Sequence, residues 1–282
     1  MLEKIYLEIT NICNLDCSFC HKTKREKKLL SSEEFDLLLG KISGKGKHLF
    51  FHIMGEPTLH PSLPEFIKKA RQGGFLPCVT TNGSLLSKSG DAIIEAEPYK
   101  VSVSLHAPEA NSAFSDKAYL GNCVSFAKKA ATRGCFVALR LWNLGSDADN
   151  SAVLDFLHKS FTGEWVERRG GESYRLDTRI FLEWGERFEW PDPNLPEADL
   201  NADLFCHGLR DQIGILVDGT VVPCCLDSDG NIPLGNLFES DLEKILSSER
   251  AKKMYSGFSC RRATESLCRK CGYAQRFSKE QK

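Results

Sequence analysis

Residues 5–20 read Ile5-Tyr6-Leu7-Glu8-Ile9-Thr10-Asn11-Ile12-Cys13-Asn14-Leu15-Asp16-Cys17-Ser18-Phe19-Cys20. The first five residues predict a strand, and the loop that leaves its C-terminal end contains three cysteines spaced Cys-x3-Cys-x2-Cys. Three thiolates bind three irons of a [4Fe-4S] cluster and leave the fourth iron without a protein ligand. Such an open iron is a place for a cofactor to bind.

A structural zinc loop is the alternative interpretation of these cysteines. Zinc sites close their shell with four ligands and usually begin with a Cys-x2-4-Cys pair that a second pair matches. His21 could serve as a fourth ligand here. The Cys-x3-Cys-x2-Cys spacing nevertheless favours the cluster.

With Phe19 before its third cysteine, the segment Cys13–Cys20 resembles the cluster loop of the radical S-adenosylmethionine (radical SAM) enzymes. The resemblance extends to about residue 184. It implies that SAM chelates the open iron and that an electron from the reduced cluster cleaves it to methionine and a 5'-deoxyadenosyl radical. This radical takes a hydrogen atom from an unactivated carbon, while the protein orients the cofactor and keeps solvent away.

The composition is that of an ordinary globular protein. With 282 residues and 41% hydrophobic content, the chain can form one large domain, or one large and one small. The formal charge of -1 gives no general attraction to nucleic acid or anionic membranes. A local basic run follows the cluster loop, and it is either a solvated loop or part of a mouth that attracts an anionic substrate: Lys22, Lys24, Arg25, Lys27 and Lys28.

The sequence predicts a cytoplasmic protein. Its first residues lack an apolar signal region, and no apolar run approaches the ~20 residues that span a bilayer. We therefore do not expect the twelve cysteines to form disulfides, because the cytosol keeps thiols reduced. Cys78, Cys123 and Cys135 are isolated in apolar stretches, and we interpret them as small buried residues.

Strand and helix patterns alternate through the first two-thirds, which predicts an α/β fold with a parallel sheet. We expect a partial (β/α)6 TIM-like barrel, with the cluster loop among the loops at the C-terminal ends of the strands. The expected strands are 5–9, 48–53, 75–80, 101–105, 136–142 and 180–184; the expected helices include one capped by Ser31 and Glu34, then 64–71, 118–133 and 152–161. Residues 163–178 are polar and Gly-rich, which predicts a loop.

Three prolines within residues 191–196 predict a domain boundary. We therefore divide the chain into a barrel, residues 1–190, and a small α+β domain, residues 191–282. The second domain should contain a β-hairpin, with strands 213–217 and 220–223 and a two-residue turn at Asp218-Gly219. Ser240 and Glu243 could cap a helix after it.

The resemblance also implies cofactor-binding residues. Met54-Gly55-Glu56-Pro57 looks like the family's Gly-Gly-Glu-Pro segment, which receives the methionine amino group of SAM, with Met54 in place of the first glycine. The remaining implied contacts are Phe19, Thr81, Asn82, Ser104 and Arg140. An arginine fork suits a carboxylate, and Arg140 stands between two leucines, so its burial implies a partner. His52 and His106 are more often structural residues than substrate contacts.

A second cysteine set lies near the C-terminus: Cys206, Cys224, Cys268 and Cys271. It resembles the SPASM or shortened "twitch" domain, which implies one auxiliary [4Fe-4S] cluster with four thiolate ligands. A four-cysteine zinc site has the same number of ligands and remains an alternative. Cys225 and Cys260 are too few for a further cluster, and their role is open.

These features favour a radical SAM oxidoreductase or maturase that oxidises a peptide or protein, with the auxiliary cluster accepting an electron. The alternatives are an aminocyclitol-like alcohol dehydrogenase and an enzyme for a nucleotide or RNA base, which the basic run allows without requiring. A different class of answer is an iron-sulfur electron carrier or a zinc-stabilised binding module. The resemblance implies an electron donor such as flavodoxin or ferredoxin, and we expect no membrane partner. Tyr99, Tyr119 and Cys225 are unranked hydrogen donors, and no catalytic residue is assigned.

Overall fold

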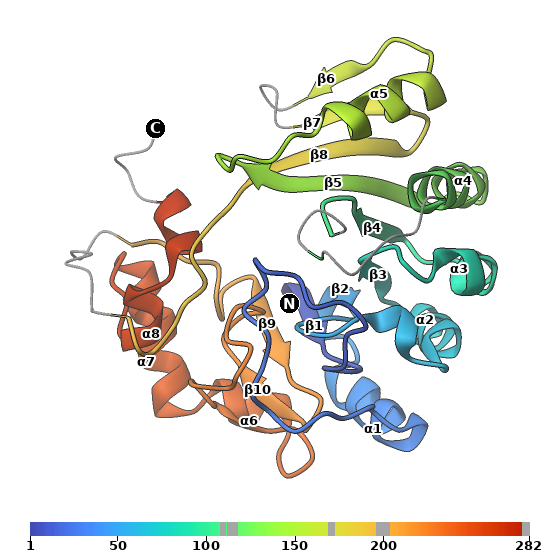
Figure 1. Cartoon of the computed structure of the whole chain (residues 1–282). Coiled ribbons are helices and arrows are strands. Elements are labelled where there is room, and N and C mark those ends of the chain that lie inside the picture. Colours follow the sequence, from blue (N-terminus) through green and yellow to red (C-terminus); the bar gives the residue numbers. More distant parts are fainter. Residues whose placement is uncertain (108–110, 112–117, 169–172, 196–203, 278–282) are drawn as a thin grey trace.

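The computed structural model describes the chain except residues 108–110, 112–117, 169–172, 196–203 and 278–282. Six parallel strands lie side by side in the order β1 (Leu2–Leu7), β2 (Gly46–Phe50), β3 (Leu76–Thr81), β4 (Lys100–Ser104), β5 (Phe136–Leu144) and β8 (Ile180–Glu186). Each pair is parallel, as crossover connections require. This curved sheet confirms the predicted partial barrel (Figure 1).

Helices connect the strands and cover the outer side of the sheet (Figure 1). They are α1 (Ser32–Ile42), α2 (Leu63–Gln72), α3 (Leu86–Glu95), α4 (Tyr119–Thr132) and α5 (Ser151–Ser160). The predicted capping box is present, because the Ser31 hydroxyl accepts from the Glu34 amide and the Glu34 carboxylate accepts from the Ser31 amide. Outward strand residues such as Ile5, Leu49 and Val101 are fully buried against these helices.

The expectation of a loop over residues 163–178 is wrong. This segment contains β6 (Val166–Arg168) and β7 (Ser173–Asp177), which pair antiparallel with each other, and β7 continues antiparallel onto β8. All three residues of β6 are exposed. A short edge strand that is wet on both faces has the composition of a loop, so its polar residues did not indicate a strand.

The C-terminal part extends the same sheet. It contains β9 (Gln212–Ile215), β10 (Thr220–Val222) and β11 (Gly235–Asn236), followed by α6 (Leu242–Leu246), α7 (Glu249–Ser259), α8 (Ser266–Arg269) and the 3-10 helix η2 (Gly272–Phe277). The strand β9 pairs parallel with β1, so the sheet runs without a break from the barrel into this part. The domain boundary near residue 191 stays a prediction.

Two local predictions in this part need correction. The β9–β10 hairpin exists, but its turn is centred on Val217-Asp218, because the Gly219 amide donates to the Leu216 carbonyl at 2.8 Å. The helix α6 begins after Asp241, which has no side-chain cap hydrogen bond, so Ser240 does not cap it. None of the helices in the described residues combines the length and apolar character needed to cross a membrane.

Alternation along the six strands sorts their side chains into two sets. On β5, Val137, Leu139 and Leu141 are fully buried toward the helices, while Arg140 and Trp142 are partly buried on the other face. We call this inner face of the barrel sheet the lumen. Its lower level is aromatic, since Tyr6 stacks on Phe50 with ring centroids 4.7 Å apart. Its upper level, toward the C-terminal strand ends, contains the polar side chains described next.

Candidate active site

The three N-terminal cysteines lie together in the loop after β1. Cys13 is exposed, and Cys17 and Cys20 are half-buried. Burial and the neighbouring thiols raise the pKa of Cys17 to about 11. Backbone amides already face the other two sulfurs: Leu15 N lies 3.4 Å from Cys13 Sγ, and Lys22 N lies 3.4 Å from Cys20 Sγ. Such N–H groups stabilise cluster thiolates, so this donor set fits a metal cluster that replaces the thiol protons.

Gly55 lets the loop after β2 touch the start of the cluster loop. Its φ is +77°, and a Cβ there would lie 2.5 Å from the Thr10 carbonyl and 2.8 Å from the Ile12 carbonyl. The next amide, Glu56 N, donates to Ile12 O at 2.8 Å. Only glycine combines this backbone conformation with this close approach. Gly55 therefore fixes the entry of the cluster loop, whatever it also contacts.

Glu56 is 2% exposed, and protein donors occupy its carboxylate. Oε1 accepts from Thr58 N, Thr58 Oγ1 and Thr81 Oγ1 at 3.0, 2.7 and 2.7 Å, and Oε2 accepts from Asn82 N at 2.6 Å. Burial raises the pKa of this carboxyl, whereas these hydrogen bonds lower it. The Glu56 side chain thus joins the loops after β2 and β3, so a cofactor contact at Glu56-Pro57 would come from the backbone.

Asn82 joins the loop after β3 to the cluster loop. Its Nδ2 donates to Asn14 Oδ1 at 3.0 Å, and Asn14 Nδ2 donates to Ser84 Oγ at 2.9 Å. The same Nδ2 lies 3.9 Å from Cys13 Sγ. Thr81, by contrast, is buried and donates to Glu56. Asn82 is therefore the member of this pair that faces the cysteines.

The remaining predicted contacts lie at the ends of β4 and β5. The Phe19 ring lies 4.9 Å from the His106 ring, which places the cluster loop over the end of β4. Ser104 and Arg140 stand opposite each other in the register of β4 and β5. Arg140 likewise stands opposite Glu183 in the register of β5 and β8. The structure thus brings every predicted cofactor residue to one rim of the barrel. Their contacts with SAM stay predictions.

The sequence did not indicate that Glu8 is a structural centre. Its side chain is fully buried and accepts from Arg25 Nη2 at 2.7 Å, Met54 N at 3.0 Å and Val217 N at 3.0 Å. It therefore joins the cluster loop, the loop after β2 and the β9–β10 hairpin. The one indication in the sequence was that Glu8 is the only acidic residue in the otherwise largely apolar predicted strand 5–9.

Three of the five side chains of the basic run form internal ion pairs. Lys22 pairs with Asp16 at 2.5 Å and Lys28 with Glu34 at 2.6 Å, while Arg25 is bound to Glu8. These contacts favour the structural interpretation of the run over the attraction of an anionic substrate.

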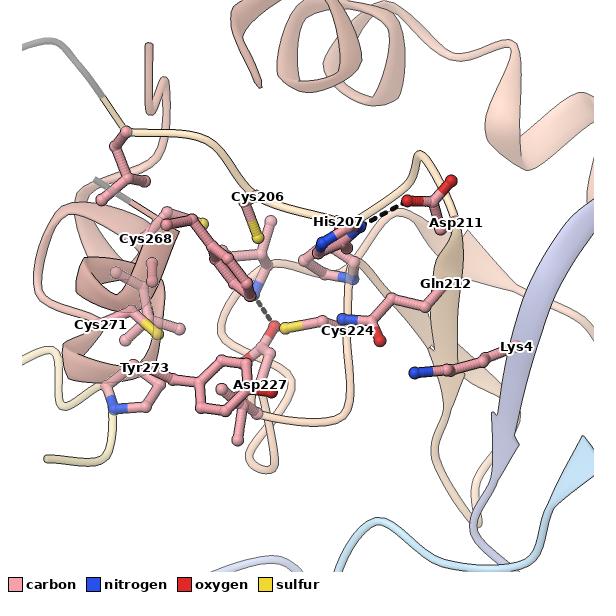
Figure 2. A pocket seen from close by; sticks show the side chains of 18 of the residues that line it. Lys4, Cys206, His207, Asp211, Gln212, Cys224, Asp227, Cys268, Cys271 and Tyr273 are labelled. Atoms are coloured by element: carbon pink, nitrogen blue, oxygen red, sulfur yellow. Dashed lines mark hydrogen bonds and ion pairs between the residues drawn. The ribbon is translucent and has the colours of Figure 1, made fainter. Parts of the chain in front are cut away.

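The four C-terminal cysteines line one cavity of about 360 Å³ (Figure 2). Burial raises the pKa values of all four thiols, neighbouring cysteines add to the increase for Cys224, Cys268 and Cys271, and the pKa of Cys271 reaches about 11. Gly208 N lies 3.3 Å from Cys206 Sγ. Among the described residues, no three His, Cys, Asp or Glu side chains converge closely enough to hold a single metal ion. Four thiols around a cavity of this size fit a cluster.

Residues beside this cavity reach the lumen. Cys225, next to Cys224, and the Tyr6 hydroxyl affect each other's pKa, and both groups interact electrostatically with Arg140. Tyr273, two residues after Cys271, interacts with Arg140 in the same way. Of the hydrogen-donor candidates, Tyr119 donates to the Asn82 and Ser104 carbonyls, so Cys225 is the one placed between the lumen and the second cysteine set.

Three polar side chains at the top of the lumen contain buried nitrogens without a hydrogen-bond partner in the described part of the chain: His52 Nδ1, Arg140 Nε and Trp142 Nε1. The Arg140 guanidinium lies 3.7 Å from the Trp142 ring centroid. Burial and the charge of Arg140 lower the pKa of His52 to about 3, so this imidazole is neutral. The partner that the sequence required for Arg140 is not a protein group within these residues.

Comparisons with known proteins agree with this geometry. The Radical SAM superfamily profile matches residues 7–128, and the iron-sulfur cluster-binding domain profile (SPASM) matches residues 206–272. A GTP 3',8-cyclase from Chlorobaculum tepidum is 35% identical over 108 residues, 37% of this chain and 33% of that protein. The subtilosin biosynthesis protein AlbA from Bacillus subtilis is 25% identical over 95% of this chain and 64% of its own length. The chain thus spans about a third of the cyclase and less than two-thirds of AlbA.

Solved structures share the fold. BtrN in complex with AdoMet and 2-DOIA superposes with a TM-score of 0.63 at 18% identity, covering 100% of this chain and 97% of BtrN. SuiB of Streptococcus suis bound to the precursor peptide SuiA gives 0.58 at 15% identity, covering 98% and 70%. The two matched domains imply a SAM-binding [4Fe-4S] cluster and an auxiliary [4Fe-4S] cluster. The chain belongs to the radical SAM superfamily and carries a SPASM-type iron-sulfur domain in its C-terminal part.

Proposed function

We propose that this chain oxidises a peptide or protein side chain by radical SAM chemistry. The observation that carries the proposal is the continuity between the two cysteine sets. The cluster loop packs on the end of β4 through Phe19 and His106, and Cys225 and Tyr273, which adjoin the second set, interact with Arg140 on the neighbouring strand β5. A substrate in the lumen therefore lies between two candidate clusters.

When bound, the first cluster and SAM supply the radical that removes one hydrogen atom from the substrate. The substrate must then lose one electron and one proton to become a closed-shell oxidised product. The four thiols of the C-terminal cavity are the candidate ligands of the cluster that receives this electron. The chain's own residues hold the loops in place and exclude water, as Glu56 and Gly55 do at the rim.

Two relatives support a peptide substrate. AlbA, whose name places it in the biosynthesis of a bacteriocin, aligns with 95% of this chain, and SuiB has been solved with a precursor peptide. A second candidate is the oxidation of a small polar molecule, because BtrN, which shares the fold, has been solved in complex with 2-DOIA. The internal pairing of Lys22, Arg25 and Lys28 weakens the feature that allowed a nucleotide.

The test is anaerobic reconstitution of the wild-type protein and three variants. We expect about 8 irons per wild-type chain and about 4 in Cys17→Ala and Cys268→Ala, because each variant loses one four-iron cluster. Given SAM and a reductant, Cys268→Ala should still form 5'-deoxyadenosine and Cys17→Ala should not. Cys135→Ala, a buried cysteine outside both sets, is the matched control and should keep both clusters.

Unaltered cofactor cleavage in Cys17→Ala, or a complete second cluster in Cys268→Ala, would refute the ligand assignments. The substrate class is tested by mass spectrometry of cell extracts with and without the active protein. Hydrogen loss in the peptide fraction supports the proposal. Hydrogen loss confined to small polar metabolites supports the second candidate instead.

A further inference from the structure

The upper lumen contains buried hydrogen-bond donors that have no acceptor among the described residues. Arg140 Nε and Trp142 Nε1 are obligate donors, and both are buried without a partner in the described residues. His52 Nδ1, also buried and unpartnered, belongs to a neutral ring that can donate or accept. A buried donor without an acceptor destabilises the protein, and more so when it is charged. A ligand that supplies acceptors here removes this cost.

The charges of the lumen specify the sign of that ligand. Lys100 Nζ lies 2.8 Å from Glu183 Oε1, so these two charges neutralise each other. The carboxylate of Glu8, directly after β1, is bound by Arg25. Arg140 interacts with Glu183 only at longer range and forms no ion pair in the described residues. Arg140 is therefore a buried lumen cation that has no carboxylate at ion-pair distance among the described residues.

The geometry of Arg140 is fixed in advance of binding. Its guanidinium lies over the Trp142 ring at 3.7 Å, and this indole packs on Gly185, where a Cβ would lie 2.8 Å from ring atoms. The His52 ring meets the Tyr6 ring edge-on at 5.6 Å. A planar guanidinium held in this way matches the planar, bidentate geometry of a carboxylate.

The strongest electrostatic neighbours of Arg140 lie toward the second cysteine set. Arg140 interacts most with Glu183, Tyr6, Tyr273 and Cys225, and its charge also lowers the pKa of His52. Cys225 and Tyr273 adjoin the second cysteine set. The cofactor amino and carboxylate groups belong at the open iron of the first cluster, whereas Arg140 lies beside the groups that lead to the second set.

We propose that Arg140, Trp142 and His52 form a binding site for a carboxylate of the substrate, and that this site replaces the predicted contact between Arg140 and SAM. The proposal rests on the proposed function, since the carboxylate belongs to the molecule that is oxidised. For a peptide it is an acidic side chain or the C-terminus. The site selects substrates that place an acidic group at a fixed distance from the reacting carbon.

The first test requires no variant. Two acetylated and amidated pentapeptides, with a central aspartate or a central asparagine between glycines, are titrated into the anaerobic holoprotein with SAM present. The two probes have the same shape and differ in charge. We expect the aspartate peptide to bind at least ten-fold more tightly, about the effect of one charge-assisted hydrogen bond. Equal affinities would overturn the proposal.

The second test locates the carboxylate. Arg140→Gln should abolish the preference for aspartate but change the SAM dissociation constant less than three-fold, and Trp142→Phe, which keeps the ring, should reduce the preference several-fold. Arg168→Gln is the matched control, because Arg168 also lies over an aromatic ring, Phe181 at 4.9 Å, but on the exposed strand β6. It should change neither constant.

A ten-fold or greater loss of SAM affinity in Arg140→Gln would show that Arg140 binds the cofactor, and it would overturn the proposal. Circular dichroism and iron content verify that each variant is folded and loaded. Both tests measure binding alone, so their result is independent of turnover. Absence of 5'-deoxyadenosine or of oxidised peptide would count against the proposed function, and absence of charge preference would count only against this site.

Discussion

At the scale of single residues, burial determines which predicted contacts have a free side chain. Glu56 and Asn82 both belong to segments that the family resemblance implied, but the Glu56 carboxylate is saturated by Thr58, Thr81 and Asn82. Asn82, by contrast, presents its amide to Asn14 and Cys13. Motif residues therefore divide into those that shape the loops and those that face the site.

His52 provides a residue-scale prediction. Its pKa falls from 6.5 to about 3 in the folded protein because of burial and the nearby positive charge of Arg140. Between these pH values the unfolded chain binds the extra proton, so this group makes stability fall as pH drops below 6.5. Lowering the pH from 7 to 5 should destabilise the wild type by about 1–2 kcal/mol more than His52→Gln. Urea unfolding of both proteins at the two pH values measures this difference. A parallel loss in the two proteins would contradict it.

The sequence could identify Arg140 as a buried cation that needs a partner, since it stands between two leucines on a strand. It could not identify the neighbours. His52, Trp142 and Tyr6 come from three strands that are distant in the chain, and only the register of the sheet brings them together. The same limit applies to Glu8, whose donors come from residues 25, 54 and 217.

At the scale of elements, strong local signals predicted the barrel strands and most helices. The helix α3 was not expected, because it has no side-chain cap and contains Gly90 in its middle. That glycine has a tertiary reason, since a Cβ there would lie 3.0 Å from the Phe126 ring of α4. Gly90 lowers the helix propensity of α3 but allows α3 and α4 to pack closely. A local sequence pattern does not reveal this tertiary contact.

Gly55 gives the prediction for elements, with Gly74 as its control. Both glycines have positive φ, +77° and +82°, but a Cβ at Gly55 collides with the Thr10 carbonyl while the space around Gly74 is open. Gly74→Ala should cost about 1–2 kcal/mol from backbone strain alone. Gly55→Ala should cost more and weaken SAM binding at least ten-fold, because the loops after β1 and β2 must separate. Urea unfolding and SAM titration measure both effects; equal behaviour of the two variants would show that the close approach is unimportant.

At the scale of the whole molecule, contacts that cross between distant segments hold the barrel to the C-terminal part. Glu8 receives Val217 N from the β9–β10 hairpin, and Asp229 receives Thr23 Oγ1 at 2.5 Å and Lys24 N at 3.2 Å from the segment after the cluster loop. The two cysteine sets are therefore connected through buried polar groups as well as through the sheet.

Glu8→Ala tests this connection. The substitution leaves Arg25 and two backbone amides without their buried acceptor, so we expect a loss of about 3–5 kcal/mol in the free energy of unfolding. Glu243→Ala is the matched control, because Glu243 also pairs across the two parts, with Lys45, but on the surface. It should change the free energy of unfolding little, because a surface ion pair contributes little to stability. Urea unfolding of the anaerobic holoproteins measures the free energy of unfolding of both variants. Similar losses in the two variants would mean that Glu8 does not hold the barrel to the C-terminal part.

The pairing of β1 with β9 also sets an order of events during biosynthesis. The first strand emerges from the ribosome early, but its neighbour on one side is translated only after most of the chain. Until then β1 presents an open edge, which invites pairing with other chains. The first strand is therefore flanked on both sides only after β9 has been translated.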